Sequence, residues 1–218
     1  MGLQVGSAVR TPRKGAAVVV GIATVVGLLG ILAGIVVAIA AGAGTSGSAA
    51  TVPVVSADPE AMSDAASAVV HGTGMPGRAP VYLTRQGTLM LSVYENVSAP
   101  TRVLAQADVA ASAIAAGVAV LLLVPVLRST ACREPFAQGN PPRLALAAGA
   151  IFLGWAAASV LPVIAASIVV RSVPAEAGGW EPVLRPDYWP LGFVALLATL
   201  AFATWHGRRL VADTEGLV

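Results

Sequence analysis

The sequence predicts an all-α membrane protein with four transmembrane helices and a small extracytoplasmic lobe that contains a β-hairpin. Four long apolar stretches without a charged residue or histidine carry this prediction, because a spanning helix needs about 20 mostly apolar residues. The composition agrees, since 56% of the residues are hydrophobic, 11% are charged and the mean hydropathy is +0.80. We therefore expect one integral membrane domain over residues 1–218, with spans at about 16–43, 109–127, 144–170 and 189–205 and the lobe at about 44–108.

The first span resembles a secretory signal, since basic residues precede it and small residues follow it. A signal core is about 7–15 residues long, however, and the apolar stretch at 16–43 is much longer. We therefore expect a retained transmembrane helix.

The basic residues predict the orientation of the spans. Lys and Arg accumulate in short cytoplasmic segments. If the N-terminus is cytoplasmic, eight of the 13 Lys and Arg residues lie in cytoplasmic segments, whereas eight of the 11 Asp and Glu residues lie in extracytoplasmic segments. Both termini are therefore expected in the cytoplasm, and the protein is expected to be multi-pass. The eight inner cations are Arg10, Arg13, Lys14, Arg128, Arg133, Arg143, Arg208 and Arg209.

Small residues recur every four positions along the first span, at Gly30, Gly34, Ala38 and Gly42. This spacing lets two helix backbones approach closely. The stripe predicts either packing against another span of the same chain or homodimerisation through Gly30 and Gly34. Prolines inside the second and third spans, Pro125 and Pro162, predict kinks because each removes a backbone donor.

Three segments of the lobe carry recognisable patterns. Residues 51–56 read as a strand, and the proline within it favours a sheet edge. Asp58 and Pro59 are typical of a helix start. Residues 81–84 and 88–94, separated by a short segment with Gly87, predict the β-hairpin. An isolated hairpin is marginal in water, so we expect it to lean on helix ends, on the loop at 172–187, or on a partner.

Residues suited to catalysis are scarce. The spans hold no His, Asp or Glu that could act as a general acid or base. The grouping of His71 with Asp58, Glu60 and Asp64 lacks a diagnostic metal spacing. The single cysteine, Cys132, excludes a disulfide within the chain. We expect no enzyme activity, no cofactor and no metal, and the absence of a basic patch argues against nucleic acid as a partner.

Two segments carry a family resemblance: Arg133-Glu-Pro-Phe-Ala-Gln-Gly-Asn-Pro-Pro-Arg-Leu144 before the third span, and Gly207-Arg-Arg-Leu-Val-Ala-Asp-Thr-Glu-Gly-Leu-Val218 at the end. They resemble the bacterial four-helix membrane family called domain of unknown function 2975, with departures at Arg133 and at Pro141-Pro142. The resemblance implies a bacterial cell (inner) membrane and no established activity. It also implies a regulatory link, since some members appear beside helix-turn-helix regulators.

The same two segments are candidates for contact with a cytoplasmic partner. The prolines of the first bar a continuous helix, and Asn140 is expected to cap the incoming helix. The alternative is a simple turn between helices. The candidate interaction residues are Pro135, Phe136, Asn140, Arg143, Asp213 and Glu215.

The sequence therefore favours a non-enzymatic integral membrane protein that acts through protein interaction or envelope sensing. Its expected partners are membrane lipids and a cytoplasmic protein or a second copy of the chain. The alternative function is a small transporter or channel subunit, which the two proline-containing spans favour. Coupled carriers usually place ionisable residues near the bilayer centre, however, and the spans contain none.

Overall fold

The computed structural model describes residues 14–44, 50–56, 81–83, 89–93, 97–134, 137–172 and 180–215. Four long helices dominate it, and a short helix, α3 (Ala99–Ala105), precedes the second of them. All four are long and apolar enough to cross a membrane, as the sequence predicts. The long helices are α1 (Lys14–Ala43), α4 (Ala107–Ala131), α5 (Asn140–Ser172) and α6 (Trp189–Glu215).

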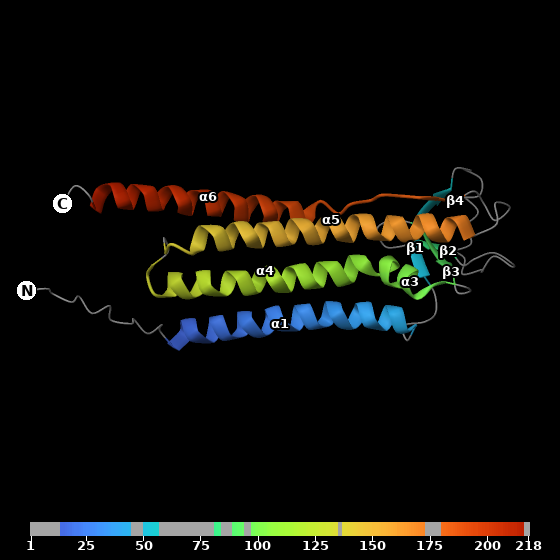
Figure 1. The fold of residues 1–218 in the computed structure, drawn as a ribbon, viewed down its shortest axis with the longest axis horizontal. Helices are drawn as coiled ribbons and strands as arrows, with labels where there is room; N and C mark the ends of the chain where they lie inside the picture. Colours follow the sequence, from blue (N-terminus) through green and yellow to red (C-terminus); the bar gives the residue numbers. More distant parts are fainter. Residues whose placement is uncertain are drawn as a thin grey trace, which may run out of the picture.

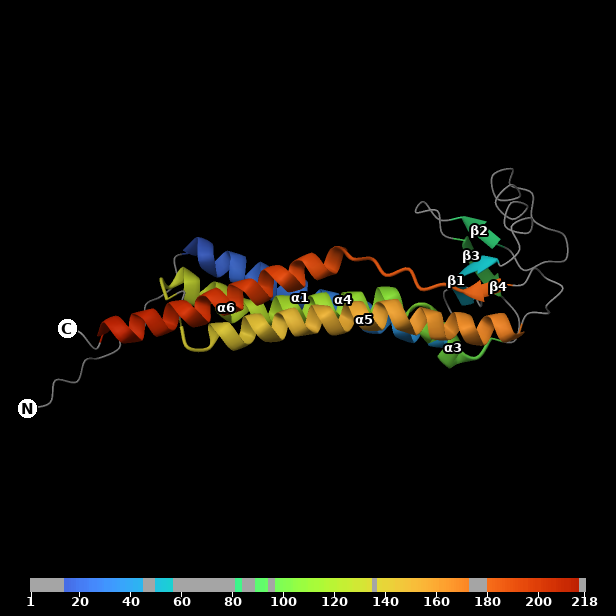
Figure 2. The ribbon, with the colours of Figure 1, turned by 90° about the horizontal axis from the view of Figure 1, so that it is seen from above.

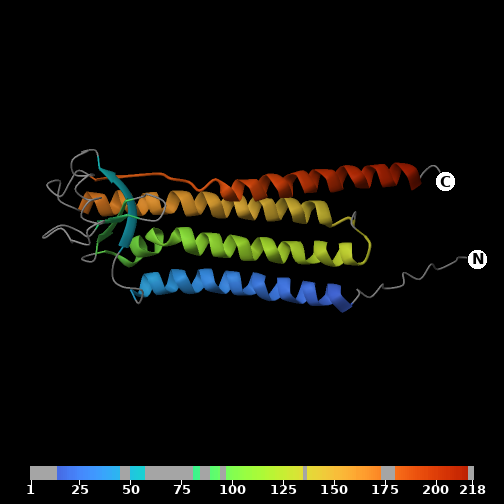
Figure 3. The same ribbon diagram turned by 180° about the vertical axis from the view of Figure 1, so that it is seen from behind.

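The long helices form an antiparallel row. Each packs against the next one along the chain: α1 on α4, α4 on α5, and α5 on α6. The start of α1 and the end of α6 lie at the same end of the row, which we call the terminal end (Figures 1 and 3). The strands lie at the other end, which we call the lobe end. The chain is therefore a multi-pass membrane protein whose first and last described residues share one side.

Helix α6 is displaced along the row towards the terminal end. It begins beside the middle of α5 and runs past the first residue of α5 (Figure 1). Residues 183–188 are non-helical and bridge the distance from the lobe to α6 (Figure 2). We call this segment the linker.

The lobe contains a four-stranded antiparallel sheet in the order β2-β3-β1-β4. Its strands are β1 (Ala50–Ser56), β2 (Val81–Leu83), β3 (Leu89–Val93) and β4 (Trp180–Pro182). The predicted hairpin is confirmed as β2–β3, with Tyr82 opposite Met90. The hairpin leans on β1 and, through Leu91, on the end of α5. The loop at 172–187 contributes β4, which pairs with β1 on the side away from the hairpin. The helix expected from Asp58 lies outside the described residues.

The expectation that β1 is an edge strand is wrong, because β1 lies between β3 and β4. Pro53 is tolerated there for a local reason. Its carbonyl accepts from the backbone N–H of Val183, 3.5 Å away and just beyond the last residue of β4. A residue in an antiparallel strand points its N and its carbonyl to the same side, so the missing donor of Pro53 also faces the end of β4. The ladder between β1 and β3 is therefore unaffected.

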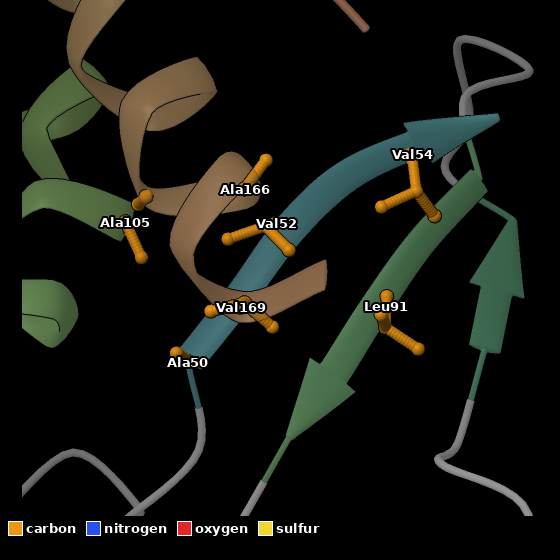
Figure 4. Close-up of a cluster of buried hydrophobic side chains, with 8 residues drawn as sticks. Ala50, Val52, Val54, Leu91, Ala105, Ala166 and Val169 are labelled. Atoms are coloured by element: carbon orange, nitrogen blue, oxygen red, sulfur yellow. The ribbon is translucent and has the colours of Figure 1, made fainter. Parts of the chain in front are cut away.

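The sheet buries one face against the end of α5 and against α3. Every second residue of β1 points to that face, as in any half-buried strand. These residues are Ala50, Val52 and Val54. They pack with Leu91 of β3 and with a small-residue surface on the helices (Figure 4). That surface consists of Ala105, Ala165, Ala166 and Val169, and Val52, Leu91, Ala165 and Ala166 are all fully buried. Alanines at these helix positions let the sheet approach the backbone of α5 closely.

Candidate functional site

The small residues of α1 face α4 of the same chain. A side-chain carbon at Gly30 would lie 3.3 Å from the Gly117 Cα, and one at Gly34 would lie 2.7 Å from the Ala110 carbonyl oxygen. Gly42 faces Val103 of α3, and Ala38 is half-buried on the same helix. Of the two predictions for this stripe, packing against another span of the same chain therefore agrees with the structure. Helix α4 covers the surface that a homodimer through Gly30 and Gly34 would need.

Arg102 joins the lobe to the end of α1. Its guanidinium donates to the carbonyls of Ala41 (3.2 Å) and Gly42 (3.1 Å) in the last turn of α1, and to the carbonyl of Val97 (3.1 Å). The last carbonyls of a helix lack partners within the helix and carry partial negative charge, so a cation stabilises them. The chain then turns at Gly44, whose φ of 73° favours glycine.

Asn140 holds the terminal ends of α4 and α5 together. Its side chain is fully buried, and its amide donates to the Ser129 hydroxyl oxygen at 2.7 Å. The Ser129 hydroxyl lies within donating distance of the Asn140 Oδ1 (3.0 Å) and of the Val126 carbonyl oxygen (2.9 Å). The structure thus shows Asn140 bridging two helices, while its capping role stays a prediction.

Helix α4 ends in a tight turn at Arg133. Its backbone has a φ of 65°, a conformation that favours glycine. The N–H groups of Arg133 and Glu134 donate to the carbonyls of Thr130 (3.0 Å) and Ser129 (2.9 Å), which satisfies the end of the helix. Arg133 therefore occupies a position where glycine would be least strained.

The predicted contact surface at the terminal end is described only in part. Pro135 and Phe136 lie outside the described residues, as do the side chains of Asp213 and Glu215, although α6 runs to Glu215. Arg143 lies over Gly139, at 3.2 Å from the position of an added side-chain carbon. Arg208 of α6 donates to the Gln138 carbonyl at 3.3 Å, so α6 does contact the turn between α4 and α5.

A cavity of about 930 Å³ lies between α4, α5 and the linker at the lobe end. Pro53 and Met90 of the sheet close one side of it, and Pro162 of α5 lines another. Neither Pro162 nor Pro125 ends its helix. Pro162 has no N–H for the carbonyl of Ala158, which also lines the cavity. The polar residues that line the cavity are Asp108, Ser112, Trp155, Ser159, Arg185 and Asp187.

Hydrogen bonds hold the linker in place where it lines this cavity. The Trp155 indole N–H donates to the Asp187 carbonyl at 2.7 Å and holds the linker against α5. The Asp187 carboxylate accepts from the backbone N–H of Trp189 at 3.1 Å, at the start of α6. Asp108, Arg185 and Asp187 are all exposed at their positions. The cavity therefore has a mostly apolar lining that also carries charged side chains of both signs.

Sequence reasoning missed this cavity because its walls come from segments that lie far apart in the chain. One signal was available: Arg185 and Asp187 immediately precede the shortest of the four apolar stretches. Among the residues that the structure describes, no three His, Cys, Asp or Glu side chains are grouped as metal ligands. His71 and the acids near it lie outside those residues.

No family model, curated protein or solved structure matches this chain. The resemblance of the two segments at the terminal end to the four-helix bacterial family therefore stays a prediction.

Proposed function

We propose that this chain is a non-enzymatic protein of a bacterial inner membrane that acts through protein interaction or envelope sensing. In this proposal the lobe is extracytoplasmic and both termini are cytoplasmic. The excess of basic residues near the terminal end supports the orientation. The resemblance of the segments at 133–144 and 207–218 to a family linked with regulators supports the regulatory role.

The observation that carries the proposal is the set of packing contacts and hydrogen bonds between the lobe and the helices. The sheet packs on Ala165, Ala166 and Val169 of α5, and Arg102 binds the last turn of α1. A displacement of the lobe must therefore act on two helices that continue to the terminal end. There, Asn140 and Arg208 connect α5, α4 and α6. A partner on the terminal side could respond to a change in the lobe through these contacts.

Crosslinking in cells followed by mass spectrometry tests the proposal. We expect a specific protein partner linked to residues of the turn between α4 and α5, or to the end of α6. A variant shortened after Arg209 should lose links that involve the end of α6. Crosslinks only between copies of this chain would contradict the proposal.

The cavity beside Pro162 favours a second candidate, a transporter or channel subunit. The described helices form a row, so a continuous aqueous path would need several copies of the chain. A homo-oligomer with water-accessible positions along α5 down to the terminal end would support this second function against the first.

A further inference from the structure

The cavity at the lobe end lies beside the lobe-side end of the apolar surface of the helices. Exposed apolar side chains on α1 run from Val18 to Ile39. At 1.5 Å per residue this belt is about 32 Å long, which matches the hydrocarbon core of about 30 Å. The cavity can therefore be placed by reference to α1.

Contacts across the row set the level of the linker. Gly154 of α5 abuts Ala111 and Ala115 of α4, and the same part of α4 faces Gly30 and Gly34 of α1. Trp155 and the Asp187 carbonyl bound to it therefore lie level with Gly30–Gly34. That level is about 8–14 Å inside the lobe-side end of the apolar belt.

Non-helical backbone at such depth is tolerated where protein buries it or where it lines a hydrated cavity. The linker meets the second condition, since Arg185, Pro186 and Asp187 all line the cavity. Ionisable side chains within the membrane are rare and mark binding sites or pathways. The exposed apolar residues of α6 begin at Trp189, directly after the linker. The linker thus brings a guanidinium and a carboxylate to the lobe-side part of the membrane, where lipid headgroups and the first part of the acyl chains lie.

We propose that this cavity binds a phospholipid of the lobe-side leaflet whose headgroup carries both a phosphate and a primary ammonium. Arg185 matches the phosphate, because a guanidinium binds two of its oxygens at once. Asp108 and Asp187 match the ammonium, which has three N–H donors. Val109 and Val163 provide apolar lining beside these groups for the first part of the acyl chains.

The charges of the site favour this headgroup over others. Two carboxylates and one guanidinium disfavour a purely anionic lipid, because such a headgroup brings no cation for either Asp108 or Asp187. A quaternary ammonium has no N–H to donate, so the carboxylates should discriminate against choline lipids. The proposal concerns lipid binding and holds for either orientation of the chain.

The test measures lipids retained by the full-length protein. The protein is reconstituted in vesicles with equimolar dioleoyl phosphatidylethanolamine and phosphatidylcholine, extracted gently, and analysed by native mass spectrometry. We expect at least one retained ethanolamine lipid per chain and a clear preference over choline lipid. Arg185→Gln and Asp108→Asn should each reduce retention about tenfold, the loss typical of one charge-assisted hydrogen bond.

Matched controls lie at the terminal end of the row. Arg209→Gln and Glu134→Gln make the same charge changes at exposed positions away from the cavity, and retention should stay at the wild-type level. Melting temperatures verify that each variant is folded, and the two test substitutions lie on separate segments, so each serves if the other reduces yield.

Two results would overturn the proposal. One is equal retention of the two lipids, or wild-type retention in both folded test variants. The other is displacement of the bound lipid by soluble glycerophosphoethanolamine at equal concentration, which would assign the site to a soluble phosphate compound.

Discussion

Replacing Gly34 by alanine tests the close contact between α1 and α4. The added carbon would lie 2.6 Å from the Ile114 Cγ1 and 2.7 Å from the Ala110 carbonyl oxygen, whereas ordinary contacts of such a carbon are 3.4–4 Å. Because one of the two atoms belongs to the backbone, a side-chain rotation cannot relieve the clash. The helices must separate locally, and overpacking of this kind costs about 1–3 kcal/mol.

Gly21→Ala is the matched control. It lies on the same helix, and nothing lies within 4 Å of the position of its added carbon. Both substitutions gain the same helix propensity, about 1 kcal/mol at most. The difference between the two variants therefore isolates the packing term, and Gly34→Ala should be less stable than Gly21→Ala by about 1–3 kcal/mol.

Unfolding in detergent, followed by circular dichroism or by thermal melting, measures this difference. Size-exclusion chromatography should give the same particle mass for both variants, since the stripe packs within one chain. Equal stability of the two variants would refute the close approach, and a change of mass in Gly34→Ala alone would restore homodimerisation through this stripe.

Three further predictions test the ends of the helices. Arg102→Lys should lower the unfolding free energy by about 1–3 kcal/mol, since an ammonium cannot reach three carbonyls as the guanidinium does; unchanged hydrogen exchange in the last turn of α1 would contradict this. Asn140→Ala should cost about 1–3 kcal/mol because it removes the buried hydrogen bonds that join α5 to the Ser129 hydroxyl of α4, which keeps only the Val126 carbonyl of its own helix; Ser129→Ala should add little in the double variant, and additive losses would argue against the bond. Arg133→Gly should stabilise the protein by about 1–2 kcal/mol, since a φ of 65° strains a residue with a side chain; a lower melting temperature would count against that backbone conformation.

The spans could be predicted because bilayer thickness imposes one requirement on each segment. Their ends could not, since backbone hydrogen bonding does not stop where the apolar residues do. Helix α6 illustrates this, because its apolar stretch ends at Trp205 whereas the helix runs to Glu215. Past that stretch its side chains contact one another: Arg209 lies 3.8 Å over the Trp205 ring.

The local part of the sheet could also be predicted, and its non-local part could not. A hairpin such as β2–β3 leaves a pattern in one short segment. Strand β4 has only three residues and pairs with β1 across more than a hundred positions of the chain. That pairing makes β1 internal, a result that Pro53 alone argues against. The cavity also depends on contacts between distant parts of the chain, because the linker meets α5 where α6 is displaced along the row.

Labelling with a membrane-impermeant maleimide tests the central claim most directly, because Cys132 is the only cysteine. Cys132 lies at the terminal end, and Ala99 is exposed at the lobe end. In spheroplasts, we expect no labelling of wild-type Cys132 until the membrane is permeabilised, and immediate labelling of Ala99→Cys in a Cys132→Ala background. Labelling of Cys132 in sealed spheroplasts, with protection of residue 99, would reverse the orientation and contradict the proposed function.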